Sequence, residues 1–225
     1  MRRLTFLFFL LIALLLPKHI FPAQIGEKIT YDVKLGALRL GKAYFNRMRP
    51  IEMNGGLVNL MTFETNLARF KDLETIYSDP DTFLPLKIER TVRAWSKREQ
   101  ITEDYDQKEF TLTIIKRNGR KTEQVSIKKD KPIHNTILLP FHVRNIPKLD
   151  IGWVFPANLP TQEFQIKLVA IDEVKVPAGI FKSYHFKSTP RKFEIWISAD
   201  ERRIPLKIKG AGGFGYTLEM REYSL

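Results

Sequence analysis

The chain has 225 residues, contains no cysteine and carries a formal net charge of +12 at neutral pH. Without cysteine, disulfide bonds and thiolate metal sites are excluded, so a hydrophobic core alone must stabilise the fold. The length that remains after a leader segment is enough for one domain with a sizeable core.

Residues 1–23 have the pattern of an export signal. Two arginines precede an unbroken apolar run over residues 4–16, which is shorter than the roughly 20 residues that cross a bilayer as a helix. We therefore expect cleavage after Ala23 and a periplasmic protein. Because Phe21 is large for its place before the cleavage site, an uncleaved N-terminal segment anchored in the inner membrane is the alternative.

Basic residues are scattered among acidic ones along the chain rather than gathered in blocks. This pattern is typical of a solvated sheet face. The functional alternative is attraction to anionic lipid or polysaccharide at an envelope surface. For an exported chain we expect a membrane surface or an envelope protein as partner, and no nucleic acid.

From residue 25 onward, apolar and polar residues alternate, which is typical of half-buried strands, as in Ile29, Tyr31 and Val33. The pattern recurs in roughly a dozen segments. Asn54-Gly55 predicts a hairpin turn, and Asn118-Gly119 predicts one of type I′. So many antiparallel strands must curl to cover their edges. We expect residues 24–225 to form one all-β, mainly antiparallel domain, a large curled sheet that is barrel-like, a half-barrel or a spiral.

Two segments interrupt this pattern and predict one or two short helical segments. Residues 66–72 suit a single helical turn. Residues 133–146 are strongly apolar, contain no glycine and are limited by Pro140 and Pro147. We expect this second segment to plug one face or one end of the sheet.

A stretch of the chain is repeated 120 positions later. Residues 78–89 and 198–209 each start with serine and reach Pro-Leu-Lys-Ile seven residues on, and each follows a glutamate, Glu74 or Glu194. The pattern predicts equivalent strand–turn–strand hairpins over residues 75–88 and 195–208. A recurrent hairpin and a duplicated half are both consistent with it.

Residues 176–181 (VPAGIF) and 193–208 (FEIWISADERRIPLKI) resemble the signature of the DUF3108 family of exported bacterial proteins. Residues 26–33 (GEKITYDV) are similar to its N-terminal phrase. In the central segment, Asn135 stands near an expected Asp, and residues 141–144 are similar to an aromatic run that ends in Arg. The resemblance implies a β-rich periplasmic protein of unknown function with no catalytic residues to carry over. By fold alone, the predicted curled sheet is similar to the curved sheets of periplasmic lipoprotein carriers.

No residue pattern in the chain predicts catalysis, a cofactor or a metal. His134 and His142 are eight residues apart, which is not a common ligand spacing, and we interpret them as surface or core side chains. Asp104 and Asp106 share one face of a strand, but charged neighbours indicate solvent around them. A hydrolase is therefore the least favoured function, and we expect a protein that is not an enzyme.

The function that remains is binding. We expect a non-enzymatic envelope protein that holds a lipid or another amphipathic molecule on the concave side of its sheet. The candidate lid over one opening consists of Ile137, Leu138, Leu139, Phe141 and Val143. The alternative is an envelope scaffold, whose interior would be packed and whose binding surface would be an exposed edge or patch.

Overall fold

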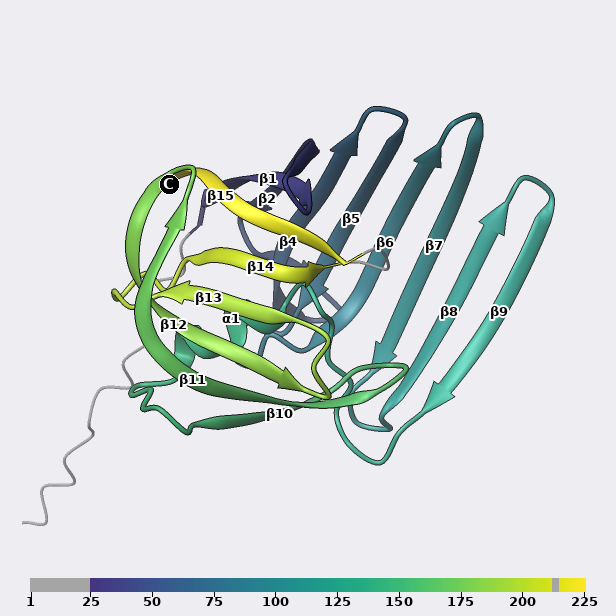
Figure 1. Ribbon diagram of the computed structural model, residues 1–225. Coiled ribbons are helices and arrows are strands. Elements are labelled where there is room, and N and C mark those ends of the chain that lie inside the picture. Colours follow the sequence, from purple (N-terminus) through teal and green to yellow (C-terminus); the bar gives the residue numbers. More distant parts are fainter. Residues whose placement is uncertain (1–24, 212–214) are drawn as a thin grey trace, which may run out of the picture.

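The computed structural model describes residues 25–211 and 215–225, and the predicted signal segment lies outside them. The described residues form fifteen strands of one sheet and two short helical segments (Figure 1). The strands are β1 (Lys28–Leu35), β2 (Leu38–Arg47), β3 (Ile51–Met53), β4 (Gly56–Leu67), β5 (Phe70–Ser78), β6 (Pro85–Ala94), β7 (Lys97–Asp106), β8 (Thr111–Asn118), β9 (Lys121–Lys128), β10 (Val154–Asn158), β11 (Glu163–Val176), β12 (Gly179–Thr189), β13 (Glu194–Ser198), β14 (Pro205–Ala211) and β15 (Tyr216–Ser224).

The sheet is an antiparallel, curled and unclosed structure. Its order is β10-β11-β12-β13-β14-β15-β1-β2-β4-β5-β6-β7-β8-β9, with β3 paired to β4 alone. The edge strands β9 and β10 are joined by residues 129–153, and β1 and β15 meet in the middle. The predicted fold class, an all-β curled sheet that is mainly antiparallel, is confirmed. Among the described residues, no helix is long and apolar enough to cross a membrane.

Alternation of side chains places the core on the inner face of the curl. Phe45 lies opposite Ile29 on one side and Phe63 on the other, and Ala43 lies opposite Tyr31. Because successive residues of a strand point to opposite faces, these apolar residues line the same, concave side. Their burial is close to complete for all but Phe63, which packs against the buried cluster.

The segment over residues 133–146 enters this concave side, where Figure 1 shows it behind β12 and β13. Only part of it is helical: α1 (Leu139–His142) is one turn and η1 (Val143–Asn145) is a 3₁₀ turn. Pro140 stands at the start of α1, where its missing N–H costs no helical hydrogen bond. The ring of Phe141 stacks on Phe45 at 4.4 Å between centroids, so the segment is part of the core.

The helical turn predicted over residues 66–72 is wrong. Residues 66–72 form the end of β4, a two-residue turn and the start of β5, with Leu67 paired to Phe70. Tight pairing of two amphipathic strands outweighed the local helical preference of Asn66 and Ala68. This hairpin tip lines the pocket described below.

Both predicted Asn-Gly hairpins are present. Asn54 and Gly55 both have positive φ angles, as a type I′ turn requires. At the other hairpin, Asn118 pairs with Lys121, so Gly119 and not Asn118 is the first loop residue. Gly119 alone has a positive φ there, which fits a type II′ turn rather than the predicted type I′.

The repeated stretch forms two hairpins of the same register, β5–β6 and β13–β14. Tyr77 lies opposite Lys87 in the first, and Trp196 lies opposite Lys207 in the second, with a bulge one residue further on in both. The predicted strand–turn–strand equivalence is confirmed. The predicted residue alignment is off by one on the first strand of each hairpin. Because the β13–β14 turn is one residue longer, Ile197 and not Ser198 takes the place of Ser78 opposite the proline.

The two turns hold the segment over residues 133–146 from two sides. Phe83 and Arg203 stand two residues before the respective prolines, and both have positive φ angles. The ring of Phe83 lies 6.4 Å from that of Phe141, and the guanidinium of Arg203 donates to the carbonyl of Val143. Positive φ in non-glycine residues costs backbone energy, which these inward contacts offset.

Candidate functional site

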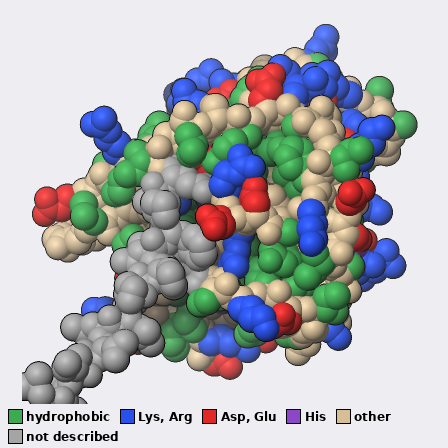
Figure 2. All heavy atoms as spheres, turned by 90° about the vertical axis from the view of Figure 1, so that its left-hand side faces the viewer, with side chains coloured by type: hydrophobic (Ala, Val, Ile, Leu, Met, Phe, Trp, Pro, Cys, Tyr) green, Lys and Arg blue, Asp and Glu red, His purple; other side chains and the backbone are tan. Residues whose placement is uncertain are grey.

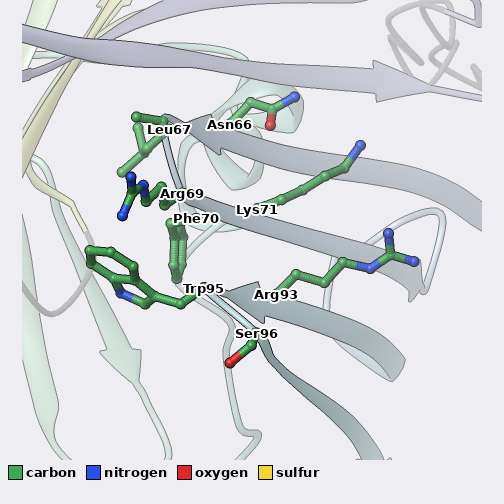
Figure 3. Close-up of a pocket in the computed structure, with 9 residues that line it drawn as sticks. Asn66, Leu67, Arg69, Phe70, Lys71, Arg93, Trp95 and Ser96 are labelled. Atoms are coloured by element: carbon green, nitrogen blue, oxygen red, sulfur yellow. The ribbon is translucent and has the colours of Figure 1, made fainter.

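The concave side of β4–β8 has three levels between the two ends of the strands. At one end, apolar residues and α1 fill the curl. In the middle is a belt of charged side chains. At the other end, the hairpin tips surround an open pocket (Figure 3).

The five residues of the predicted lid belong to the apolar level. Leu138 and Phe141 are buried in the cluster that contains Phe45, and Ile137 packs against that cluster from its edge. Leu139 and Val143 are buried in a second cluster under β10–β13. The segment thus joins the two halves of the core at the end of the curl where β5 and β6 are connected.

A buried ion pair ties this segment to the beginning of β1. The guanidinium of Arg144 donates to both carboxylate oxygens of Glu27 at 2.7 and 2.6 Å, and neither side chain is more than 6 % exposed. Arg144 also lies 4.7 Å above the ring of Phe141. Bidentate pairing of this kind is strong and directional. Glu27 and Arg144 both occur in motifs that carried the family resemblance, and the structure shows that the motifs meet.

The charged belt contains more carboxylates than cations. Arg90 donates to both oxygens of Asp72 at 2.9 and 2.5 Å and lies 3.6 Å from Glu74. On β7, the hydroxyl of Tyr105 donates to Glu103 at 2.6 Å. Register places all of these side chains on the concave face. Burial, with Asp72 and Glu103 nearby, raises the pKa of Glu74 from 4.5 to about 7, although Arg90 opposes the shift.

The raised pKa of Glu74 predicts that the protein becomes less stable as pH rises. The folded protein retains a proton that the unfolded chain loses above pH 4.5, so the free energy of unfolding falls as pH rises from 4.5 to about 7. The full shift corresponds to about 3 kcal/mol. We expect Glu74→Gln to remove most of this slope in urea unfolding series. The exposed Glu163→Gln should leave it unchanged, and equal slopes for Glu74→Gln and wild type would contradict the assignment.

The open pocket lies between the β4–β5 and β6–β7 tips and has a volume of about 610 Å³. It is lined by Asn66, Leu67, Ala68, Arg69, Phe70, Lys71, Arg93, Trp95 and Ser96. In Figure 3, Arg69, Phe70 and Trp95 lie on one side of the strand ends, whereas Lys71 and Arg93 extend to the other. The volume is in the range of small-molecule sites, and the lining is mixed: Leu67, Ala68, Phe70 and Trp95 are apolar, whereas Arg69, Lys71 and Arg93 form a cationic border.

Trp95 is the most exposed large apolar residue of the described chain, with 76 % of its surface accessible. Its backbone has a positive φ of 58°, and its ring lies 4.9 Å from the guanidinium carbon of Arg69. An indole in solvent costs free energy that packing against an apolar ligand would recover. The pair presents a flat aromatic surface beside a positive charge.

The carboxylates considered for hydrolysis lie elsewhere. Asp104 and Asp106 are exposed, and Asp106 accepts the backbone N–H groups of Lys108 and Glu109, which holds the β7–β8 turn. These hydrogen bonds lower the pKa of Asp106, the opposite of what a general acid requires. Asp104 and Asp106 therefore act as ordinary surface and turn residues in this geometry.

The two histidines are core residues. His134 and His142 lie with ring centroids 5.2 Å apart, and both rings pack against Phe155 of β10. Burial lowers the pKa of His142 to about 3, so this ring is neutral. Within residues 25–211 and 215–225, no group of three or more His, Asp or Glu residues is arranged to hold a metal ion.

Sequence reasoning missed the pocket and the belt. The pocket lies at residues interpreted as a helical turn, and the only available signal was an aromatic residue, Trp95, among basic ones at a strand end. The belt residues Asp72, Glu74 and Arg90 were indistinguishable from the solvated side of a strand. Their inward direction depends on register with Phe63 and Met61 across β4.

Comparison with solved structures supports the fold. The crystal structure of a β-barrel-like protein of domain of unknown function DUF1849 from Brucella abortus matches with a TM-score of 0.53 and 9 % identity, over 89 % of this chain and 98 % of that one. A putative exported protein with a YmcC-like fold from Bacteroides fragilis matches with a TM-score of 0.33 and 11 % identity, over 91 % and 98 % of the respective chains.

At 9 % identity, the likeness to the Brucella abortus structure concerns the fold alone. Comparison with curated proteins gave no match. The model of the DUF3108 family, described as a protein of unknown function, matches residues 30–221, which include most of β1, both hairpins of the repeated stretch and the buried segment between them. The chain therefore belongs to the DUF3108 family.

Proposed function

We propose that the protein is a non-enzymatic component of the bacterial envelope that binds an anionic amphipathic molecule, such as a phospholipid, in the pocket between the β4–β5 and β6–β7 tips. The pocket itself carries the proposal, since it combines an aromatic floor with a cationic border. An export signal over residues 1–23 remains the reason for placing it in the envelope. The carboxylate pair Asp104 and Asp106 offers no support for hydrolysis.

The apolar part of the ligand would lie on Leu67, Phe70 and Trp95. These residues form the upper end of the concave face, so an acyl chain has apolar contact along the inner side of the tips. Its further path is limited by the charged belt, one residue pair below Phe70, where Asp72 and Arg90 are hydrogen-bonded to each other. The ligand is therefore held at the open end and does not enter the filled curl.

The anionic part of the ligand would lie on the cationic border. Arg69 already stands over Trp95, on the same side of the strand ends as Phe70 in Figure 3. Its guanidinium has no ion pair with another described residue, so it is available for a phosphate or carboxylate group. Arginine binds such groups through two parallel hydrogen bonds.

Binding of a monomeric, short-chain phosphatidylglycerol, measured by calorimetry below its micelle concentration, tests the proposal. We expect Phe70→Ser to weaken binding about tenfold, because it removes an aromatic contact surface. Phe110→Ser is the matched control, since Phe110 is also half-buried and lies in the β7–β8 turn at the opposite end. Equal affinities of Phe70→Ser and wild type would refute the pocket as the site.

One observation favours the alternative of a scaffold. The curl is filled at one end by Leu138 and Phe141, as expected of a packed interior. A scaffold would recognise an envelope protein through an exposed patch, and no lipid would accompany it. Mass spectrometry of organic extracts from protein purified without detergent distinguishes the two: a stoichiometric lipid supports the binding protein, and its absence supports the scaffold.

A further inference from the structure

We propose that the protein docks on anionic membranes through the four hairpin tips β1–β2, β4–β5, β6–β7 and β8–β9. This inference goes beyond the proposed function, because it concerns a surface that extends across the sheet and not the ligand of one pocket. The four tips lie at the same end of adjacent strands, and Figure 1 shows them along the top of the molecule.

Charge is distributed unevenly between the two ends of these strands. The tips, residues 34–39, 66–71, 93–98 and 116–121, contain 11 Lys and Arg residues and no Asp or Glu. The connections at the opposite end, residues 48–55, 79–84 and 106–110, contain five Asp and Glu residues and two Lys and Arg residues. In Figure 2, where the tip end is also uppermost, Lys and Arg predominate along the upper edge. The fold thus brings Lys and Arg residues that are scattered in the sequence together at one end of the strands.

Most of the tip cations are not neutralised within the protein. Among the described residues, seven of the eleven have no ion pair: Arg69, Arg93, Lys97, Arg98, Lys116, Arg117 and Arg120. On the outer face, Lys71 lies opposite Arg93, and Arg93 lies opposite Arg98. Like charges directly opposite each other in a sheet are destabilising. Lys71 in this row pairs with Glu64 at 2.8 Å, whereas Arg93 and Arg98 have no ion pair with a described residue, and anionic head groups lying against the row would compensate their charge.

Apolar residues stand at the same tips. Leu35 and Leu38 flank the β1–β2 turn and are 49 % and 65 % exposed, and Trp95 projects from the β6–β7 turn. Tryptophan favours the membrane–water interface, where its ring is partly in the acyl region. Apolar insertion combined with attraction of Lys and Arg to anionic lipid is how peripheral proteins bind membranes. The occupant that fits both features is therefore an anionic bilayer surface.

Co-sedimentation with vesicles of phosphatidylglycerol and phosphatidylcholine tests the docking surface, using the natively processed protein. We expect wild type to bind vesicles with 30 % phosphatidylglycerol and to lose binding as salt is raised, as electrostatic attraction requires. The double variant Arg117→Gln/Arg120→Gln should bind about 25-fold more weakly, roughly fivefold for each cation. The control is Arg49→Gln, because Arg49 is an exposed cation at the opposite end with no ion pair to another described residue, and this variant should bind as wild type does.

A second pair of variants tests the apolar contribution. Leu38→Ser should weaken binding to the same vesicles about tenfold. Leu57→Ser is matched to it, because Leu57 is 67 % exposed and lies at the other end of the sheet, at the start of β4. If Leu38→Ser and Leu57→Ser bind alike, or if wild type binds pure phosphatidylcholine equally well, the docking surface is wrong.

Measuring monomer binding and vesicle binding for every variant distinguishes membrane docking from ligand binding in the pocket. Leu38, Arg117 and Arg120 lie outside the pocket, so their variants should retain affinity for the monomeric phosphatidylglycerol. Phe70→Ser should lose the monomer and retain vesicle binding. Failure of wild type to bind the monomer while it still binds vesicles would overturn the proposed function alone, and normal vesicle binding by the tip variants would overturn the docking surface.

Discussion

Replacement of Glu27 by alanine should lower the free energy of unfolding by about 3–5 kcal/mol, measured by urea denaturation at pH 7. The change leaves the guanidinium of Arg144 buried without its counter-charge. Two further buried cations are near it: Arg47, whose own pKa is lowered by burial and by Arg144, and Arg203, which receives a hydrogen bond from Arg144 on its carbonyl. The buried positive charge left without a counter-charge would therefore be larger than that left when an isolated ion pair loses its carboxylate.

Two controls show whether the effect comes from the unpaired charge. The double variant Glu27→Met/Arg144→Met removes both charges and should recover much of the loss, because two apolar side chains of similar length can fill the site. Lys131 and Glu163 form an exposed pair at 2.8 Å, and Glu163→Ala should cost no more than about 1 kcal/mol. A loss below about 1 kcal/mol for Glu27→Ala would contradict the structural role of the pair.

Leu138→Arg should prevent stable folding. Leu138 is fully buried in the cluster of apolar and aromatic side chains that contains Phe45 and Phe141, where a guanidinium would lose its hydration. The milder Leu138→Ala should cost about 2–5 kcal/mol, because it leaves a cavity in a close-packed core. Near-ultraviolet circular dichroism and thermal unfolding of the purified variants measure both effects.

An exposed position provides the comparison for the arginine substitution. Ile151 is 64 % exposed in the segment before β10, and Ile151→Arg should fold with a free energy of unfolding close to that of wild type. A folded, cooperative Leu138→Arg would mean that residues 133–146 lie on the surface as a movable lid. The contacts of Leu138 and Phe141 argue for a permanent core element.

The strands and hairpins were predictable because their signals are local. Alternation of apolar and polar residues identifies a strand such as β1 without knowledge of its neighbours, and Asn-Gly identifies a turn. The apolar segment over residues 133–146 was predictable as a plug for the same reason. The helix in this segment is shorter than the apolar run that predicted it. Tertiary contacts, such as the hydrogen bonds of Gln107 with Ile133, determine the conformation of residues 133–138 instead.

The site was not predictable because it depends on register and curvature. Whether Glu74 and Arg90 face inward follows from their pairing with β4 and β7, and a shift of one residue would expose them. The pair Glu27 and Arg144 is separated by 117 residues. The tip cations look scattered in sequence because each tip contributes only two to four of them. The turns gather them at one end only when consecutive strands pair in order.

The strand order also dictates when the sheet can be completed. β1 has β2 on one side and β15 on the other, so the first and last strands of the chain are neighbours in the middle of the sheet. The two free edges come from the middle of the chain. Partners so far apart in sequence pair slowly, because the loop that they close costs entropy. Loss of β15 would open a gap in the centre of the sheet rather than shorten its edge, and folding of the two halves would be uncoupled.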